Sequence, residues 1–357
     1  MRVIVVGAGA VGGFVGARLA LAGNQVTLVG RPWLVDAVRG HGLRLIEPRR
    51  ERVVQRGLGV VASVAEASAP GPFDLALLTV KTYDVATAAS EMQEAGLGHP
   101  PVVCLQNGIG SEERLSQAFG PDRVIAASLT QPVSVPEPGV VRLVKTRGGI
   151  ALAPVAREAN IAHVASILEK AGLNVRVYRD YRTVKWSKLP LNILGNTIPA
   201  ILDMPPGEVY AHPGLLRVEV AAMRELTAVA RALGVRIVNL PGYPARPLMW
   251  ALGHLPAPLL SPLLHRLVGG GRKGRVPSLL RGLTQARTVS EVTDLNGAVV
   301  RCGARAGVPT PVNRLLTETL EAIYAGGADV WSEWRHRPER LVEACKTPAA
   351  VGQARRA

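Results

Sequence analysis

The sequence predicts an α/β protein in which a doubly wound parallel-sheet domain is followed by an all-helical domain. Three observations support this prediction. The first ~150 residues alternate short Val/Ile/Leu runs with helix-length segments, a glycine-rich turn directly follows the first run, and strand-like runs cease near Asp180. A chain of 357 residues also suits two domains, each large enough to bury its own core.

Eight apolar runs in the first half are expected to form strands. They are Arg2–Val6, Gln25–Val29, Leu43–Ile46, Phe73–Thr79, Val102–Leu105, Val124–Leu129, Val140–Val144 and Gly149–Leu152. The first several runs are continuous rather than alternating, which is typical of strands that are buried on both faces of a parallel sheet. The helix-length segment Val11–Ala22 ends at Gly23-Asn24, so residues 1–30 are predicted to form a β-α-β unit.

Helical patterns replace the strands beyond Asp180, with apolar residues spaced three and four apart. These patterns cover Arg182–Leu202, Pro213–Leu233, Ser278–Ala306 and Pro311–Tyr324. We therefore expect a first domain over 1–180, a helical domain over 181–327 and a basic tail over 328–357. The Pro/Gly-rich segment Asn239–Pro277 is expected to be irregular, and the tail is expected to be weakly ordered.

The net charge of +15 is concentrated in one part of the chain. Residues 226–290 contain no Asp or Glu but nine Lys and Arg. A solvated surface, steering of an anionic ligand and contact with an anionic membrane or macromolecule all fit this charge. Nucleic-acid binding is not expected, because aromatic residues are only 4% and do not alternate with basic ones. The leucines within this segment suit a lid or a homodimer contact, and the sequence leaves that choice open.

Composition also bounds the surroundings of the protein. Three scattered cysteines show no metal-ligand spacing, so we expect no metal site, no disulfide framework and a reducing, cytoplasmic compartment. The N-terminus enters a strand directly, without the pattern of a signal peptide. Prolines, histidines and a glycine interrupt the longest apolar stretch, Pro247–Val268, so no transmembrane segment is expected.

A phosphate-binding turn is predicted at the start of the chain. Gly7-Ala8-Gly9-Ala10-Val11-Gly12 follows a strand and opens a helix, which is the context that a G-x-G-x-x-G motif needs. The first glycine permits the tight turn, the second lets pyrophosphate approach the backbone, and the third lets the helix pack on the strand. The helix N-terminus then favours the phosphate charge, so we predict a Rossmann-type dinucleotide site.

The end of the second strand indicates which dinucleotide binds. An NAD-preferring site carries an acid there, whereas this chain has Val29-Gly30-Arg31. The planar guanidinium of Arg31 suits a 2′-phosphate, and Lys81 after a later strand is a second candidate for the same group. We therefore favour NADP(H) over NAD(H); the alternative is that Arg31 is only a solvated loop residue.

Candidate reactive residues follow a buried strand and lie on a helix. Asn107 follows such a strand and can position a nicotinamide or a substrate carbonyl, or can form a plain Asn-Gly turn. Lys188, Asn192 and Asn196 are spaced four apart, which places them on one helix face. A lysine there can protonate an alkoxide formed by hydride transfer, but the three residues could also be a solvated polar face. Pro190 is expected to bend this helix.

Several motifs taken together resemble the ketopantoate reductase (2-dehydropantoate 2-reductase) family over about residues 1–325. They are Gly7–Gly12, Val80-Lys81-Thr82, Gln106-Asn107-Gly108, Trp186–Asn192 with Asn196, Pro277–Leu280, Ser290–Gly297 and Gly307–Asn313. The resemblance implies a Rossmann domain followed by a helical domain of the 6-phosphogluconate-dehydrogenase-like type. It also implies NADPH-dependent reduction of ketopantoate to pantoate, in the pathway to pantothenate and coenzyme A. The alternatives are a paralogue that reduces another 2-keto acid or an imine, and a protein that senses NADP or binds nucleic acid on this scaffold.

The resemblance also implies roles for individual residues. Lys188 would be the general acid, and Glu291 would help to orient both substrate and lysine. Asn192 and Asn196 would hold the substrate hydroxyl and nearby groups, and Ser278 would bind the substrate carboxylate. Asn107 would bridge cofactor and substrate.

This chain departs from the family pattern in its substrate half. Leu279-Leu280-Arg281-Gly282 stands where members commonly have Met-Leu-Gln-Asp, and one extra residue separates Ser278 from Glu291. Pro190 replaces a small helix-forming residue, the segment Asn239–Pro277 is longer, and the tail is additional. Cofactor and reaction type are therefore safer expectations than ketopantoate itself.

Overall fold

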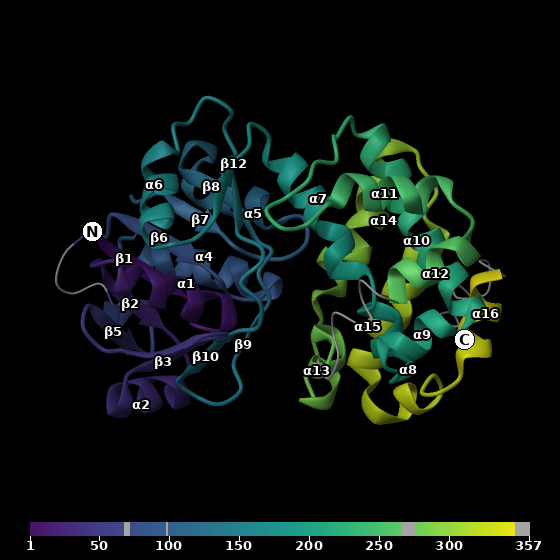
Figure 1. Cartoon of the computed structure of the whole chain (residues 1–357), viewed down its shortest axis with the longest axis horizontal. Helices are drawn as coiled ribbons and strands as arrows, with labels where there is room; N and C mark the ends of the chain where they lie inside the picture. The colour runs from purple at the N-terminus through teal and green to yellow at the C-terminus, as the bar shows by residue number, and fades with distance from the viewer. Residues whose placement is uncertain (68–71, 98, 266–275, 347–357) are drawn as a thin grey trace. The chain divides into compact units, whose positions relative to one another are not determined.

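The computed structural model describes residues 1–67, 72–97, 99–265 and 276–346. Contacts divide the chain into two units. The first unit comprises Met1–Lys188 with Val238–Pro244, and the second comprises Leu189–Ile237 with Ala245–Ala357. Figure 1 shows the strand-rich first unit in purple to teal and the helical second unit mainly in green to yellow.

An eight-stranded sheet forms the centre of the first unit. Its order is β12 (Val175–Val177), β11 (Ile150–Pro154), β8 (Val124–Leu129), β7 (Val102–Cys104), β6 (Leu75–Leu78), β1 (Arg2–Val6), β2 (Gln25–Val29) and β5 (Leu58–Val61). Neighbouring strands are parallel except β8 and β11, which run antiparallel. The predicted parallel sheet is therefore confirmed, with one antiparallel pair.

Alternate residues of the central strands enter two separate cores. Val3 and Val5 of β1 pack on one face, while Ile4 and Val6 pack on the other. Helices cover both faces, as the continuous apolar runs predicted. The first face packs against α1 (Ala10–Leu21), α2 (Pro32–His41) and α6 (Ala162–Lys170), and the second against α3 (Val64–Ala67), α4 (Val85–Glu94) and α5 (Ser111–Phe119).

A second, four-stranded sheet contains two of the strands predicted from sequence. Its order is β4 (Arg50–Val54), β3 (Leu43–Glu47), β10 (Val140–Leu143) and β9 (Val133–Ser134). The placement of Leu43–Ile46 among the two-face-buried strands was therefore wrong. Leu43 and Leu45 are buried whereas Arg44 is partly exposed and pairs with Glu51, so this strand has the alternation of a strand buried on one face.

Helices make up the second half of the chain. The long helix α10 (Pro213–Ala232) contacts six of the other helices. The series is α7 (Tyr181–Ile193), which crosses the division between the units, then α8 (Thr197–Leu202), α9 (Pro206–Ala211), α10, α11 (Ala245–His254), α12 (Ala257–Leu264), α13 (Ser278–Thr284), the 3-10 turn η4 (Glu291–Asp294), α14 (Asn296–Ala306), α15 (Pro311–Ser332) and α16 (Pro338–Lys346). The predicted all-helical character is confirmed.

Two of the predicted long helices are interrupted. The pattern over Arg182–Leu202 breaks into α7 and α8 at Gly195, whose φ of 60° ends a regular helix. The pattern over Ser278–Ala306 breaks into α13, η4 and α14, with Ala286 in the left-handed region at φ 52°. Apolar spacing alone did not reveal either break, because the apolar residues continue on the far side of each turn.

Two segments are more regular than expected. Asn239–Pro277 contains α11 and α12. Pro256 stands just before α12, where proline is compatible with a helix start, whereas Pro262 lies inside that helix. The expectation of a weakly ordered tail was wrong up to Lys346, since α16 forms there and fully buries Leu341. Four of the nine basic residues in 226–290, and the tail beyond 346, lie outside the described residues.

Two further properties concern membrane-spanning helices and cysteines. None of the helices in the described ranges is long and apolar enough to cross a membrane. Cys104, Cys302 and Cys345 form no disulfide.

Candidate active site

The glycine turn at residues 7–12 joins the end of β1 to the start of α1. Gly7 has a φ of 95°, and a side chain there would lie 2.6 Å from the Val80 nitrogen. A side chain at Gly12 would lie 2.4 Å from Thr79 Oγ1, whereas Gly9 faces nothing nearer than 4.0 Å. Two of the glycines therefore permit close packing, and Gly9 leaves the backbone open to a ligand.

Hydrogen bonds fix the shape of this turn. The Gly7 and Ala8 amides donate to the Val29 carbonyl at 3.1 and 2.9 Å. Thr79 Oγ1 donates to the Gly7 carbonyl at 2.6 Å. These bonds attach the turn to the ends of β2 and β6, and they leave the first turn of α1 available to a phosphate group.

Four adjacent strands end beside the turn and carry the other cofactor candidates. β7, β6, β1 and β2 are parallel neighbours, so the residues that follow them lie along one edge of the sheet. Arg31 follows β2 and is exposed, Lys81 follows β6 and is partly exposed, and Asn107 follows β7 and is exposed. All three predicted side chains therefore belong to the edge that carries the glycine turn.

The loop that presents Asn107 is held by buried polar groups. Gln106 is 4% exposed, and its Nε2 donates to the Leu78 carbonyl at 2.9 Å and to the Val80 carbonyl at 3.2 Å. Cys104 Sγ donates to Gln106 Oε1 at 2.9 Å. Burial raises the pKa of the Cys104 thiol well above its usual range, so this thiol stays protonated and acts as a donor.

Lys188 and Asn192 lie one turn apart on α7. Lys188 is 8% exposed and Asn192 is partly buried. Asn192 Nδ2 is buried and finds no hydrogen-bond partner among the described residues, which is costly unless a ligand supplies an acceptor. This amide is the observation that most directly indicates a ligand.

Asn196 belongs to a different helix from Lys188 and Asn192. The prediction that one helix carries all three residues was wrong, because α7 ends at Ile193 and Asn196 is the N-cap residue of α8. The turn nevertheless keeps Asn196 beside Asn192, since Asn196 Nδ2 donates to the Asn192 carbonyl at 2.8 Å.

Asn196 also contacts Ser278 at the start of α13. Asn196 Nδ2 lies 3.2 Å from Ser278 Oγ, and the Leu279 amide donates to Asn196 Oδ1 at 3.2 Å. Ser278 is exposed while Asn196 is buried, so the amide supports a hydroxyl that is accessible from outside. Glu291, the other predicted residue of this half, begins η4 and is 7% exposed.

A buried polar chain supports the turn that carries Asn196. Thr197 Oγ1 donates to Asn296 Oδ1 at 2.7 Å, and Asn296 Nδ2 donates to Asn313 Oδ1 at 3.0 Å. Asn313 Nδ2 in turn donates to Glu225 Oε2 at 2.7 Å. Asn296 and Asn313 therefore have a structural role in this chain, because they support the turn that carries Asn196.

The sequence patterns did not identify Lys185 and Glu112, which hold the loop that contains Asn107. Lys185 Nζ lies 2.8 Å from Glu112 Oε1, and the two side chains are 2% and 1% exposed. The available signal was Lys185 itself, which stands three residues before Lys188 and therefore lies on a similar face of the same helix. Thr79, which secures the glycine turn, gave no comparable signal.

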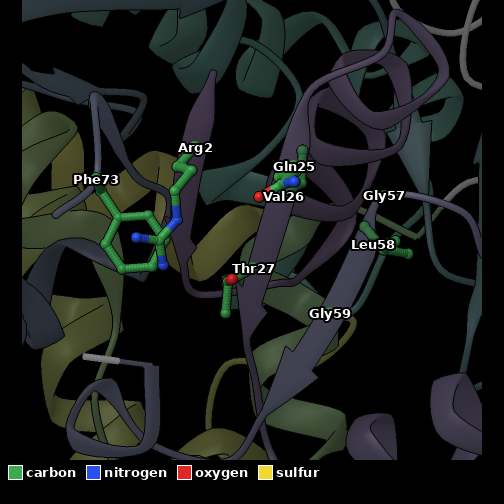
Figure 2. A pocket seen from close by; sticks show the side chains of 8 residues that line it. All are labelled: Arg2, Gln25, Val26, Thr27, Gly57, Leu58, Gly59 and Phe73. Atoms are coloured by element: carbon green, nitrogen blue, oxygen red, sulfur yellow. The ribbon is translucent and has the colours of Figure 1, made fainter. Parts of the chain in front are cut away.

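A pocket in the first unit lies at the amino ends of the strands, opposite the carboxyl ends that carry the glycine turn. Figure 2 shows its lining, in which Arg2, Gln25 and Leu58 stand at the amino ends of β1, β2 and β5. The Arg2 guanidinium carbon lies 5.0 Å from the centre of the Phe73 ring, so its charge already makes a cation–π contact. This pocket is separate from the candidate site at the carboxyl ends.

A dinucleotide-binding α/β unit that ends at a buried lysine, followed by a helical unit with clustered amides, defines a class of nicotinamide-dependent oxidoreductases. Comparison with known proteins identifies the family. Residues 3–157 match the model described as "Ketopantoate reductase PanE/ApbA", and residues 180–324 match "Ketopantoate reductase PanE/ApbA C terminal". The chain belongs to the ketopantoate reductase family.

Individual relatives agree with this assignment. A 2-dehydropantoate 2-reductase of Halobacterium salinarum is 30% identical over 92% of this chain and 100% of its own length. The crystal structure of a PanE/ApbA family ketopantoate reductase from Ralstonia eutropha is 30% identical, covers 91% of this chain and 99% of its own, and superposes with a TM-score of 0.75. D-Mandelate dehydrogenase, solved with NADH and anilino(oxo)acetate, has the same fold with a TM-score of 0.73 at 22% identity, over 91% of this chain and 99% of its own.

Proposed function

We propose that this protein reduces 2-dehydropantoate (ketopantoate) to pantoate with NADPH. Family membership over both halves of the chain supports the reaction type. The observation that carries the proposal is the polar group formed by Lys188, Asn192 and the Asn196–Ser278 pair, which includes an amide with no protein partner in the described structure. Such a group suits a small, oxygen-rich acid.

The residues of the first unit fit the proposed cofactor. The open face of Gly9 and the α1 N-terminus, over Ala8, Ala10 and Val11, would receive the pyrophosphate. Arg31 would bind the 2′-phosphate, with Lys81 as a second cation for that group. NADPH, when bound, supplies the hydride that reduces the carbonyl carbon. Arg31 thus supports NADPH rather than NADH, since no acid follows β2 to bind the ribose hydroxyls.

The residues around α7 and α13 would act on the keto acid. Lys188 would stabilise the oxygen that gains charge as the carbonyl is reduced, and would then donate its proton to that oxygen. Asn192 Nδ2 would donate to the same oxygen or to the neighbouring hydroxyl. Ser278, held by Asn196, would bind the carboxylate, which fixes the carbonyl next to it.

Two further residues complete the proposal. Glu291, buried at the start of η4, would accept a hydrogen bond from the substrate or from Lys188 and so orient them. The exposed Asn107 would contact both the cofactor and the substrate. We propose the reducing cytoplasm as the place of action, which suits three cysteines that form no disulfide.

A substrate panel tests the function. NADPH oxidation should be followed at 340 nm with ketopantoate and with other 2-keto acids, including an aromatic one, and each should be repeated with NADH. We expect ketopantoate to have the highest kcat/KM and NADPH to be preferred. A higher kcat/KM with another acid would assign the chain to a paralogue. No reduction of any 2-keto acid would refute the proposed reaction.

A further inference from the structure

A buried ion pair lies against the loop that contains Asn107, next to the Gln106 carbonyl. Lys185 of α7 and Glu112 of α5 approach to 2.8 Å with almost no solvent exposure. Lys185 Nζ also donates to the backbone carbonyl of Gln106 at 2.5 Å. Its charge is therefore satisfied by one carboxylate and by the residue immediately before Asn107.

Stability alone is a poor reason for such a pair. Desolvating two charges offsets much of their attraction, and apolar residues of similar volume often stabilise such a position equally well or better. The position of the group that the pair binds gives a better reason for it. Its ammonium binds a specific loop carbonyl, which a pair of apolar side chains could not do.

The Asn107 loop has two anchors, and Lys185 provides one of them. The Gln106 side chain binds the carbonyls of Leu78 and Val80 on the sheet side. The Gln106 carbonyl is held by Lys185 on the α7 side. Beyond Gln106, Gly108 and Gly110 have φ values of 86° and 121°, so the loop between the anchors and α5 has glycine's conformational freedom.

We propose that the Glu112–Lys185 pair is a positioning device for the reduction: it fixes the Gln106 carbonyl, and through it Asn107, against the turn of α7 that leads to Lys188. This inference rests on the proposed function, because Asn107 and Lys188 matter to it as cofactor-contacting and proton-donating residues. Neither Glu112 nor Lys185 touches the substrate in this proposal.

A variant that removes the charges together separates positioning from folding. Lys185→Met/Glu112→Leu leaves no unpaired buried charge, so it should fold, but it cannot hold the Gln106 carbonyl. We expect kcat for the keto acid to fall about 10- to 100-fold, because small misplacements of reacting groups have effects of that size. KM for NADPH should change less than kcat does, by about tenfold at most, since the glycine turn is untouched and only the Asn107 contact with the cofactor is disturbed.

Hydrogen–deuterium exchange of the same proteins provides a readout independent of turnover. The amides of residues 106–110 should exchange faster in the double variant, while those of α10 should not change. Arg52→Met is the matched control, because it breaks the Arg52–Glu47 ion pair in the four-stranded sheet. It should leave both kcat and loop exchange at wild-type values.

The outcomes are distinct. A folded double variant with wild-type kcat, or with wild-type exchange over 106–110, would overturn the positioning role. If that variant does not fold, Lys185→Gln/Glu112→Gln makes the same test, since a glutamine is neutral and too short to reach the carbonyl. A wild-type chain that reduces no 2-keto acid would refute the proposed function instead, and loop exchange would still decide whether the pair holds the loop.

Discussion

Asn196 and Ser278 are joined by a hydrogen bond of 3.2 Å between Asn196 Nδ2 and Ser278 Oγ, although 82 residues separate them in the chain. The same Asn196 side chain accepts the Leu279 amide, so it caps the first turn of α13. One buried amide thus sets the position of an exposed hydroxyl. The proposed carboxylate site depends on that relationship.

Replacing Asn196 tests whether its hydrogen bond to Ser278 positions the proposed carboxylate site. Asn196→Ala should lower kcat/KM for the keto acid about 10- to 100-fold, because Ser278 loses its support and a hydrogen bond to a charged group is worth ~1.5–3 kcal/mol. Asn160→Ala is the matched control, since Asn160 Oδ1 also accepts a backbone amide at the start of a helix, that of Ala162 at 3.0 Å in the first unit. Steady-state kinetics should show a loss only for Asn196→Ala, and equal kinetics for the two variants would contradict the role of Asn196.

Lys188 is predicted to be the proton donor. Lys188→Ala should reduce kcat about 10²- to 10⁴-fold, the usual range for loss of a general acid. NADPH binding, measured by its fluorescence, should change little. The exposed Lys170 at the end of α6 offers a control, and Lys170→Ala should retain wild-type kcat. Full kcat in Lys188→Ala would remove Lys188 from the chemistry.

Arg31 is predicted to set the choice of dinucleotide. Arg31→Asp should lower the ratio of kcat/KM with NADPH to that with NADH about 10- to 100-fold, because it exchanges a phosphate ligand for a repelling charge. Arg39→Asp makes the same charge change within α2 and should leave the ratio unaltered. An unchanged ratio in Arg31→Asp would show that another group, such as Lys81, reads the 2′-phosphate.

Many of these side chains could be located from sequence because glycine motifs and strand ends leave clear signals. The turn at Gly7–Gly12, the strand β1 and the exposed Asn107 all follow from local patterns. Asn196 was found by helical spacing even though it lies outside the helix, since Gly195 turns the chain without moving Asn196 away from Asn192.

The parts that sequence could not provide are pairings between distant residues. Nothing local tells Leu43–Glu47 to leave the main sheet and pair with Val140–Leu143, because that choice depends on which strand edge is free. Likewise, Glu112 reads as an ordinary acid in a first helical turn, and only the fold places it against Lys185. Long-range partners decide both cases.

The Glu112–Lys185 pair should make a contribution to the stability of the fold that is lost at high pH. Burial acts to lower the pKa of Lys185, but the Glu112 carboxylate and nearby groups outweigh burial, so the pKa stands above its ordinary 10.5. A folded pKa above the unfolded one means that the ammonium stabilises the fold below about pH 10.5 and that this contribution is lost as pH rises through the folded pKa.

Denaturation with urea at a series of pH values measures this term. The difference in unfolding free energy between the wild type and Lys185→Met/Glu112→Leu should move against the wild type above about pH 10.5. Most other titrating groups are common to both proteins and cancel in the difference. Tyr181 does not cancel fully, because Glu112 contributes to raising its pKa, and this remainder also moves against the wild type as pH rises. A difference that stays constant through that range would contradict a charged, paired Lys185.

The most direct test of the central claim is the mass of the product formed from ketopantoate and NADPH that carries deuterium at both C4 positions of the nicotinamide. Hydride transfer to the carbonyl carbon predicts pantoate about one mass unit heavier than the product of ordinary NADPH, and this product should be nearly absent with Lys188→Ala. Recovery of unreduced ketopantoate, or of pantoate without deuterium, would contradict the account.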